Sequence, residues 1–180
     1  MTIRQNTIGF RRFTRVWALL LITGLALMAV GLAVLVLSLT VAPPAGLGVQ
    51  DGRLSECPGS PNCVSTQTDD SSHWIEPLTF ECDASQVIAQ LAEIIEAMPR
   101  STIVSQTDSY LHAVFRSRLL RFPDDVEFLV EVESRRVHFR SASRIGHSDL
   151  GVNRDRMERI RREFQRRTRR SASIGQTCLR

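Results

Sequence analysis

The chain has 180 residues, a formal net charge of +4 and 43% hydrophobic residues, so it can form one domain plus an accessory segment. All of its 23 basic side chains are arginine, and they are unevenly distributed: residues 1–50 carry four and no acid, residues 51–153 carry nine against sixteen acids, and residues 154–180 carry ten against three. No Walker, GxGxxG or GxSxG motif occurs, so the sequence does not support nucleotide binding or an α/β-hydrolase site.

The N-terminal part predicts a membrane anchor. Residues 1–15 form a basic tail, and residues 16–42 contain no charged side chain. At about 1.5 Å per residue this apolar stretch reaches roughly 40 Å as a helix, enough to cross a bilayer core with tilt. The arginines before it predict a cytoplasmic N-terminus, with the following domain periplasmic or extracellular. A cleaved signal peptide is the alternative, although its apolar region is normally shorter.

Residues 43–55 are rich in proline and glycine and are predicted to be a linker, followed by a loop over residues 57–72. Cys57 and Cys63 flank a short proline-containing segment of this loop. In an oxidising compartment such a pair forms a disulfide, which we prefer over free thiols or a metal site. A metal would need further ligands, for which His73 and Cys82 are candidates without a CxxC motif. Cys82 and Cys178 are left as a second bridge or as single thiols.

A strand is predicted over residues 74–81, a helix over 84–98, and two short strands over 102–105 and 110–117. The helix has a continuous apolar face made by Ala84, Val87, Ile88, Leu91, Ile94, Ile95 and Met98. Asp83 and Gln86 have the spacing of a capping box, and Pro99 follows the helix end.

Alternating apolar residues predict a hairpin with strands near 126–133 and 136–142, joined by a two-residue turn at Ser134 and Arg135. That turn places Val130 opposite Phe139, and Asp125 opposite Arg144. From Asn153, a predicted N-cap, the spacing becomes helical. The resulting order β-α-β-β-β-β-α predicts an α+β fold over residues 56–170. It is a two-layer domain with a mainly antiparallel sheet covered by two helices, followed by a flexible tail over 171–180.

The segment FPDDVEF at residues 122–128, with RSASRIGHSDLGVNRDRMERIR at 140–161, resembles the signature of the DUF1499 family. CPGSPNCVSTQ at residues 57–67, with His73 and Pro77, is similar to the N-terminal motif of that family. The resemblance covers about residues 54–167. This family has no known function, so the resemblance supports the domain assignment and implies no catalytic residues.

Eight polar residues are predicted to gather at one end of the sheet: Asp124, Asp125, Arg140, Arg144, His147, Asp149, Asn153 and Arg154. The preferred interpretation is a partly buried ion network that fixes the hairpin to the last helix. In the other interpretation Arg140, Arg144 and the helix start bind an anion. A divalent cation or a serine nucleophile fits the pattern less well, because arginines compete for the acids and no nucleophile elbow is present.

These residues lead to two functional hypotheses. The first is a non-catalytic binding or structural protein of the cell envelope, with no cofactor and no metal. The second is an enzyme of unrecognised type, with a site at Asp124, Asp125, Arg140, Arg144, His147 and Asp149. The arginine-rich helix over residues 154–170 is interpreted as a solvated face, or as a surface that docks on anionic headgroups of the same membrane. Nucleic acid is not expected as a partner, because the predicted topology places this helix outside the cytoplasm.

Overall fold

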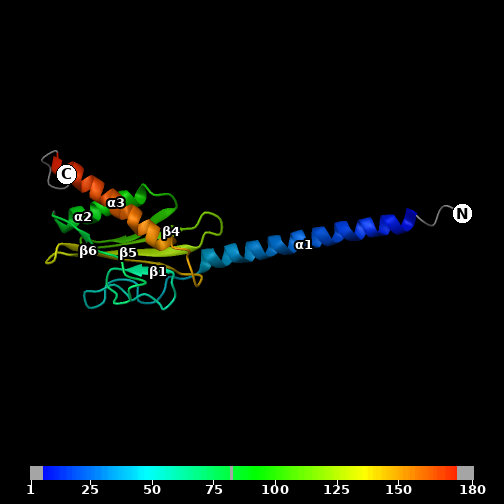
Figure 1. Ribbon diagram of the computed structural model, residues 1–180, viewed down its shortest axis with the longest axis horizontal. Coiled ribbons are helices and arrows are strands. Elements are labelled where there is room, and N and C mark those ends of the chain that lie inside the picture. Colours follow the sequence, from blue (N-terminus) through cyan, green and yellow to red (C-terminus); the bar gives the residue numbers. More distant parts are fainter. Residues whose placement is uncertain (1–5, 82, 174–180) are drawn as a thin grey trace.

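A long N-terminal helix leads into a body in which one sheet carries two helices on one face (Figure 1). This computed structural model describes residues 6–81 and 83–173, and the side chains of residues 13–81 and 83–170. Helix α1 spans Asn6–Thr40, and its part Phe13–Thr40 is long and apolar enough to cross a membrane. Cys82 and Cys178, and most of the predicted C-terminal tail, lie outside the described residues.

The sheet has six strands, all paired antiparallel, which confirms the predicted α+β class. They are β1 (Cys63–Ser65), β2 (Leu78–Thr79), β3 (Ser101–Gln106), β4 (Tyr110–Arg116), β5 (Pro123–Glu131) and β6 (Arg136–Ser143). The order is β1-β6-β5-β4-β3, and β2 pairs with the other end of β6. The prediction of a loop throughout residues 57–72 is wrong, because β1 lies there. Three residues are too few to show an alternation, and β1 exists only because the edge of β6 is there to pair with it.

The predicted hairpin register is wrong by two residues. Val130 pairs with Val137, and Phe128 pairs with Phe139, because the turn contains four residues and not two. Arg135 closes this turn with a positive φ of 53°, and its N–H donates to the carbonyl of Val132. Since a shift of two residues preserves the face of every side chain, the inward-facing set survives the error. Val132 alone is lost from it, and its side chain is 57% exposed.

The core lies between the sheet and helices α2 (Ala84–Glu96) and α3 (Val152–Ser173). Five residues of the predicted α2 face are buried, and Ala84 and Met98 at its ends pack partly against the core. The sheet contributes Leu111, Ala113, Phe115, Val126, Phe128, Val130, Val137 and Phe139, and α3 contributes Met157, Ile160 and Phe164. Burial of each large apolar side chain stabilises the fold by about 1.5–3 kcal/mol, so this layer supplies most of the driving force.

The two predicted helix caps have different outcomes. Asp83 lies at the N-cap position of α2, but its side chain makes no capping hydrogen bond. The prediction of Asn153 as the N-cap of the last helix is wrong. Helix α3 begins at Val152, so Asn153 lies inside its first turn. The carboxylate of Asp149 accepts the N–H groups of Gly151 (3.0 Å) and Asn153 (2.7 Å) instead. Gly151, with a φ of 84°, turns the chain into the helix earlier than the apolar spacing suggests.

The sheet face opposite the helices is covered by the segment that precedes β1. Within it, the N–H of Gly48 donates to Oε1 of Glu127 at 2.7 Å. Leu54 is buried, and the carbonyl of Val41 accepts from Nη1 of Arg144 at 3.2 Å. The residues predicted to be a linker therefore lie on the sheet, where they form the walls of the site described next.

Candidate functional site

The strand β5 sends its two neighbouring aspartates to opposite faces of the sheet, because successive side chains of a strand alternate. Asp124 faces α3, and Asp125 faces the segment that precedes β1. The eight residues predicted to gather at one sheet end therefore do not form a single cluster.

On the outer face, Asp125 is held by a basic side chain on each side. Nε and Nη2 of Arg144 each lie 2.7 Å from its carboxylate, and Nε2 of His112 lies 2.8 Å from Oδ1. Burial would raise the pKa of Asp125, but the hydrogen bonds from Arg144 and His112 outweigh it and keep that pKa below its usual range. An ionised carboxylate only accepts, so Nε2 of His112 carries the hydrogen.

A second carboxylate, Glu127, lies two residues along the same face and is fully buried. Its Oε1 accepts from the hydroxyl of Tyr110 at 2.8 Å and from the N–H of Gly48 at 2.7 Å. Nη1 of Arg140, its direct partner across the strands, lies 3.5 Å from Oε2. Burial and the hydrogen bond to this carboxylate raise the pKa of Tyr110 strongly, so Tyr110 stays protonated and donates.

Sequence reasoning missed Tyr110, His112 and Glu127. The alternation that places Asp125 on the outer face also places Glu127 there, and this was a usable signal. Tyr110 and His112 come from the neighbouring strand β4, where Tyr110 pairs with Leu129 and His112 pairs directly with Glu127. Only the pairing of β4 with β5 brings them next to these acids.

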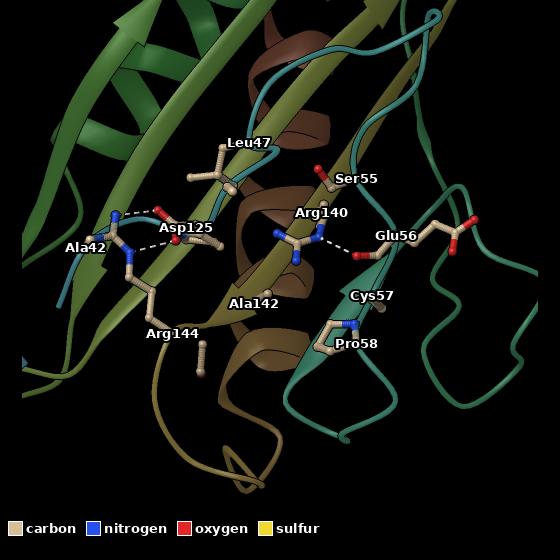
Figure 2. A pocket seen from close by; sticks show the side chains of 13 residues that line it. Ala42, Leu47, Ser55, Glu56, Cys57, Pro58, Asp125, Arg140, Ala142 and Arg144 are labelled. Atoms are coloured by element: carbon tan, nitrogen blue, oxygen red, sulfur yellow. Dashed lines mark hydrogen bonds and ion pairs between the residues drawn. The ribbon is translucent and has the colours of Figure 1, made fainter.

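Above these pairs lies a hollow of about 450 Å³ (Figure 2). Asp125, Arg140, Ala142, Ser143 and Arg144 form its floor, and its walls are Ala42, Pro44, Ala45 and Leu47 on one side and Ser55, Glu56, Cys57 and Pro58 on the other. The guanidinium of Arg140 lies between the two walls, and its Nε donates to the carbonyl of Glu56 at 3.3 Å. The sulfur atoms of Cys57 and Cys63 are 2.04 Å apart, a disulfide-bonding distance that fixes the second wall to β1.

The face under the helices holds a different network, centred on Asn153. Its Oδ1 accepts from Ser141 Oγ and from Nη1 of Arg156, each at 2.6 Å. Its Nδ2 donates to the carbonyl of Asn62 and to Ser143 Oγ, each at 3.0 Å. Arg156, which was not predicted, also forms an ion pair with Asp124. These bonds join α3 to β6 and to the residue that precedes β1, on the sheet face that the helices cover.

The other predicted residues lie apart from both networks. His147 is exposed, and Asp149 caps α3. Arg154 donates to the carbonyls of Ser72 and Trp74, each at 3.0 Å. His73 is buried, with Nδ1 2.8 Å from the carbonyl of Cys63, so this nitrogen carries a hydrogen. Among residues 6–81 and 83–173, no group of three or more His, Cys, Asp or Glu is arranged to hold a metal ion.

Fold and site together define a class: a two-layer α+β domain behind one apolar helix, with a polar-floored hollow on the sheet face that the helices leave open. The sequence model of the family described as "Protein of unknown function (DUF1499)" matches residues 53–164, and the chain belongs to this family. The resemblance noted in the sequence is thereby confirmed. No curated protein matches the chain. The family description carries no activity, so function has to be argued from the hollow itself.

Proposed function

We propose that this chain is a single-pass membrane protein whose domain lies outside the cytoplasm and binds a small molecule in the hollow of Figure 2. The anchor is supported by α1, whose part Phe13–Thr40 is long and apolar enough to cross a membrane and exposes many large apolar side chains. The orientation is supported by four arginines before the span and none directly after it. The disulfide distance between Cys57 and Cys63 fits an oxidising compartment.

One observation favours binding over catalysis: the charged side chains on the floor of the hollow neutralise one another. Asp125 is occupied by Arg144 and His112, and Glu127 by Arg140 and Tyr110. A general base has to turn toward the reacting group, and both carboxylates are held in place by these donors. The six residues of the enzyme hypothesis are also divided between opposite sheet faces and an exposed loop.

The lining indicates what kind of molecule fits. The first wall, Ala42 to Leu47, is apolar, and the guanidinium of Arg140 lies between it and the second wall, where it donates to the carbonyl of Glu56. A volume of about 450 Å³ is within the range of small-molecule sites, which combine apolar walls with a few placed polar groups. We therefore expect a small amphipathic molecule with an oxygen acceptor directed at Arg140.

Filling the hollow tests this proposal. Ala45 is an exposed wall residue, so Ala45→Trp obstructs the hollow at little cost in stability. Val49→Trp, in the same segment but outside the lining, is the matched control. The full chain is purified from membranes in mild detergent, and its extract is compared by mass spectrometry. A small molecule present with wild type and Val49→Trp, and absent with Ala45→Trp, supports binding. Identical extracts from all three proteins refute it.

Topology is tested separately with a C-terminal reporter that is active only in the cytoplasm. The proposal expects no reporter activity in intact cells. Activity there would reverse the orientation and would remove the oxidising compartment from the argument for the Cys57–Cys63 pair.

A further inference from the structure

A second hollow, of about 400 Å³, lies on the other side of the domain, where the turn after α2, the end of β4 and the start of α3 meet. Five of its lining residues are arginines, against two aspartates: Arg100, Arg116, Arg118, Arg156 and Arg159. None of the functional residues of the first hollow belongs to this lining. We call it the arginine hollow.

The positive charge of the arginine hollow is largely uncompensated. Asp124 is neutralised by its ion pair with Arg156, which leaves four arginines against Asp155. Nη1 of Arg116 donates to the carbonyls of Ser38 (3.3 Å) and Arg121 (3.2 Å), which carry no net charge.

Within the described part of the chain, Arg100, Arg118 and Arg159 form no ion pair with a carboxylate. Arg118 and Arg159 are exposed. Their guanidinium groups are therefore available to an anion. Phosphate is a suitable one, because the planar guanidinium matches its geometry.

The arginine hollow adjoins the end of the apolar helix. Ser38, in the last turns of α1, donates from its hydroxyl to the carbonyl of Leu120, in the loop over residues 117–122. This loop lies beside the C-terminal end of α1 (Figure 1). Two of its side chains are apolar and face solvent: Leu119 is 85% exposed, and Leu120 is 38% exposed.

The length of α1 places this loop at the depth of the headgroups. A bilayer core about 30 Å thick takes up about 20 helical residues. A core that begins after Arg15 therefore ends near Val36, and the contact at Ser38 falls in the interfacial layer on the domain side. An apolar tip with flanking arginines is the usual composition of a segment that lies in this layer.

We propose that the arginine hollow binds the phosphate of an anionic phospholipid headgroup in the leaflet where α1 ends, while Leu119 enters the acyl boundary. This inference rests on the proposed anchoring of α1 in a membrane. The first turn of α3 borders the arginine hollow and adds the positive end of its helix dipole to the arginines. Helix α3 then runs away from α1 (Figure 1), so among the arginines of residues 154–170 only those near its start lie at this surface.

The test uses the full chain in lipid nanodiscs and measures amide hydrogen exchange of residues 117–122 by mass spectrometry. Nanodiscs of phosphatidylglycerol are compared with nanodiscs of phosphatidylcholine, and with phosphatidylcholine plus inorganic phosphate. We expect slower exchange only in phosphatidylglycerol. Each arginine near an anionic surface is worth about fivefold in equilibrium constant, so Arg118→Gln with Arg159→Gln should reduce the protection by up to about 25-fold.

Two further variants complete the design. Leu119→Gln should also reduce the protection, and its exposed position leaves folding unaffected. Arg136→Gln with Arg169→Gln removes the same charge from exposed positions at the start of β6 and in the last turns of α3, and should leave the protection unchanged.

Each outcome decides between the proposals. Equal protection in both lipids, or protection that survives the Arg118 and Arg159 substitutions, overturns the headgroup site. Protection by inorganic phosphate in phosphatidylcholine assigns the arginines to a free anion and overturns the lipid as its source. A chain that does not remain with the nanodiscs overturns the anchoring, whereas a chain that remains without lipid-dependent protection overturns this inference alone.

Discussion

The ion pair between Asp125 and Arg144 should be one of the most strongly coupled pairs in the domain. The side chain of Asp125 is 1% exposed and that of Arg144 9%, and two nitrogens of the guanidinium lie 2.7 Å from the carboxylate. Removing one partner of such a buried pair leaves the other charge uncompensated, at a cost of about 3–5 kcal/mol. We expect Asp125→Asn and Arg144→Gln each to destabilise the domain by about 3 kcal/mol.

The double variant should lose less unfolding free energy than the sum of the two single losses. With both charges gone, no buried ion is left unpaired, and the amide oxygen at position 125 can still accept from His112. We expect a coupling energy of about 2 kcal/mol, near the upper part of the range measured for contacting groups. Urea unfolding of the full chain in detergent micelles, followed by the fluorescence of Trp74 in the domain, gives the four free energies of unfolding.

An exposed pair provides the matched control. Arg166 lies 2.7 Å from Glu163, but its side chain is 67% exposed. The hydrogen bonds from Arg166 and Arg167 lower the pKa of Glu163 to about 2, yet solvent screening leaves this exposed pair with little net effect on stability. The same cycle with Glu163→Gln and Arg166→Gln should therefore show almost no coupling. Additive effects at Asp125 and Arg144, indistinguishable from this control, would refute the assignment of a buried pair.

Three further predictions follow from the same contacts. Asn153→Ala should destabilise the domain by about 3 kcal/mol, because it leaves several buried polar partners unsatisfied. A free energy of urea unfolding within about 1 kcal/mol of the wild-type value would contradict this. Cys57 and Cys63 should resist thiol labelling in native protein and react after reduction, and substituting both by serine should cost about 2 kcal/mol for so short a loop; labelling without reductant would show that no bond forms. The pKa of Asp125 in the folded protein lies below its unfolded value of about 3.9. Its contribution to the free energy of unfolding is therefore complete above that pH and disappears as the pH falls through the folded pKa. Wild type should lose more stability than Asp125→Asn between pH 5 and pH 2, and parallel plots of the unfolding free energy against pH would exclude Asp125 as the source of this loss.

The elements of the fold could largely be read from the sequence, because each depends on local periodicity. The face of α2 and the alternation in β5 and β6 are repeated over enough residues to distinguish a helix from a strand. The shortest elements could not be delimited in this way. The two residues of β2 lie within the strand predicted over residues 74–81, whereas the three residues of β1 fall in a predicted loop and pair with the edge of β6.

The candidate site was less predictable than the fold. Asp125, Arg140 and Arg144 were expected together and line one hollow. Asp124 was grouped with them because it is their neighbour in sequence, although strand geometry directs it to the opposite face. Tyr110 and His112 carry no local pattern that distinguishes them from other strand residues, and their contacts exist only through the pairing of β4 with β5.

Local sequence by itself therefore determined the apolar helix, the helix-covered core and the set of side chains on each strand face, because these properties depend on residues a few positions apart. Tertiary structure decided which charges meet, where the segment over residues 43–55 lies, and that a loop carrying Leu119 is held beside the end of α1. Each of these depends on contacts between residues distant in the chain, and the free energy of such contacts is set by burial and geometry that no local spacing encodes.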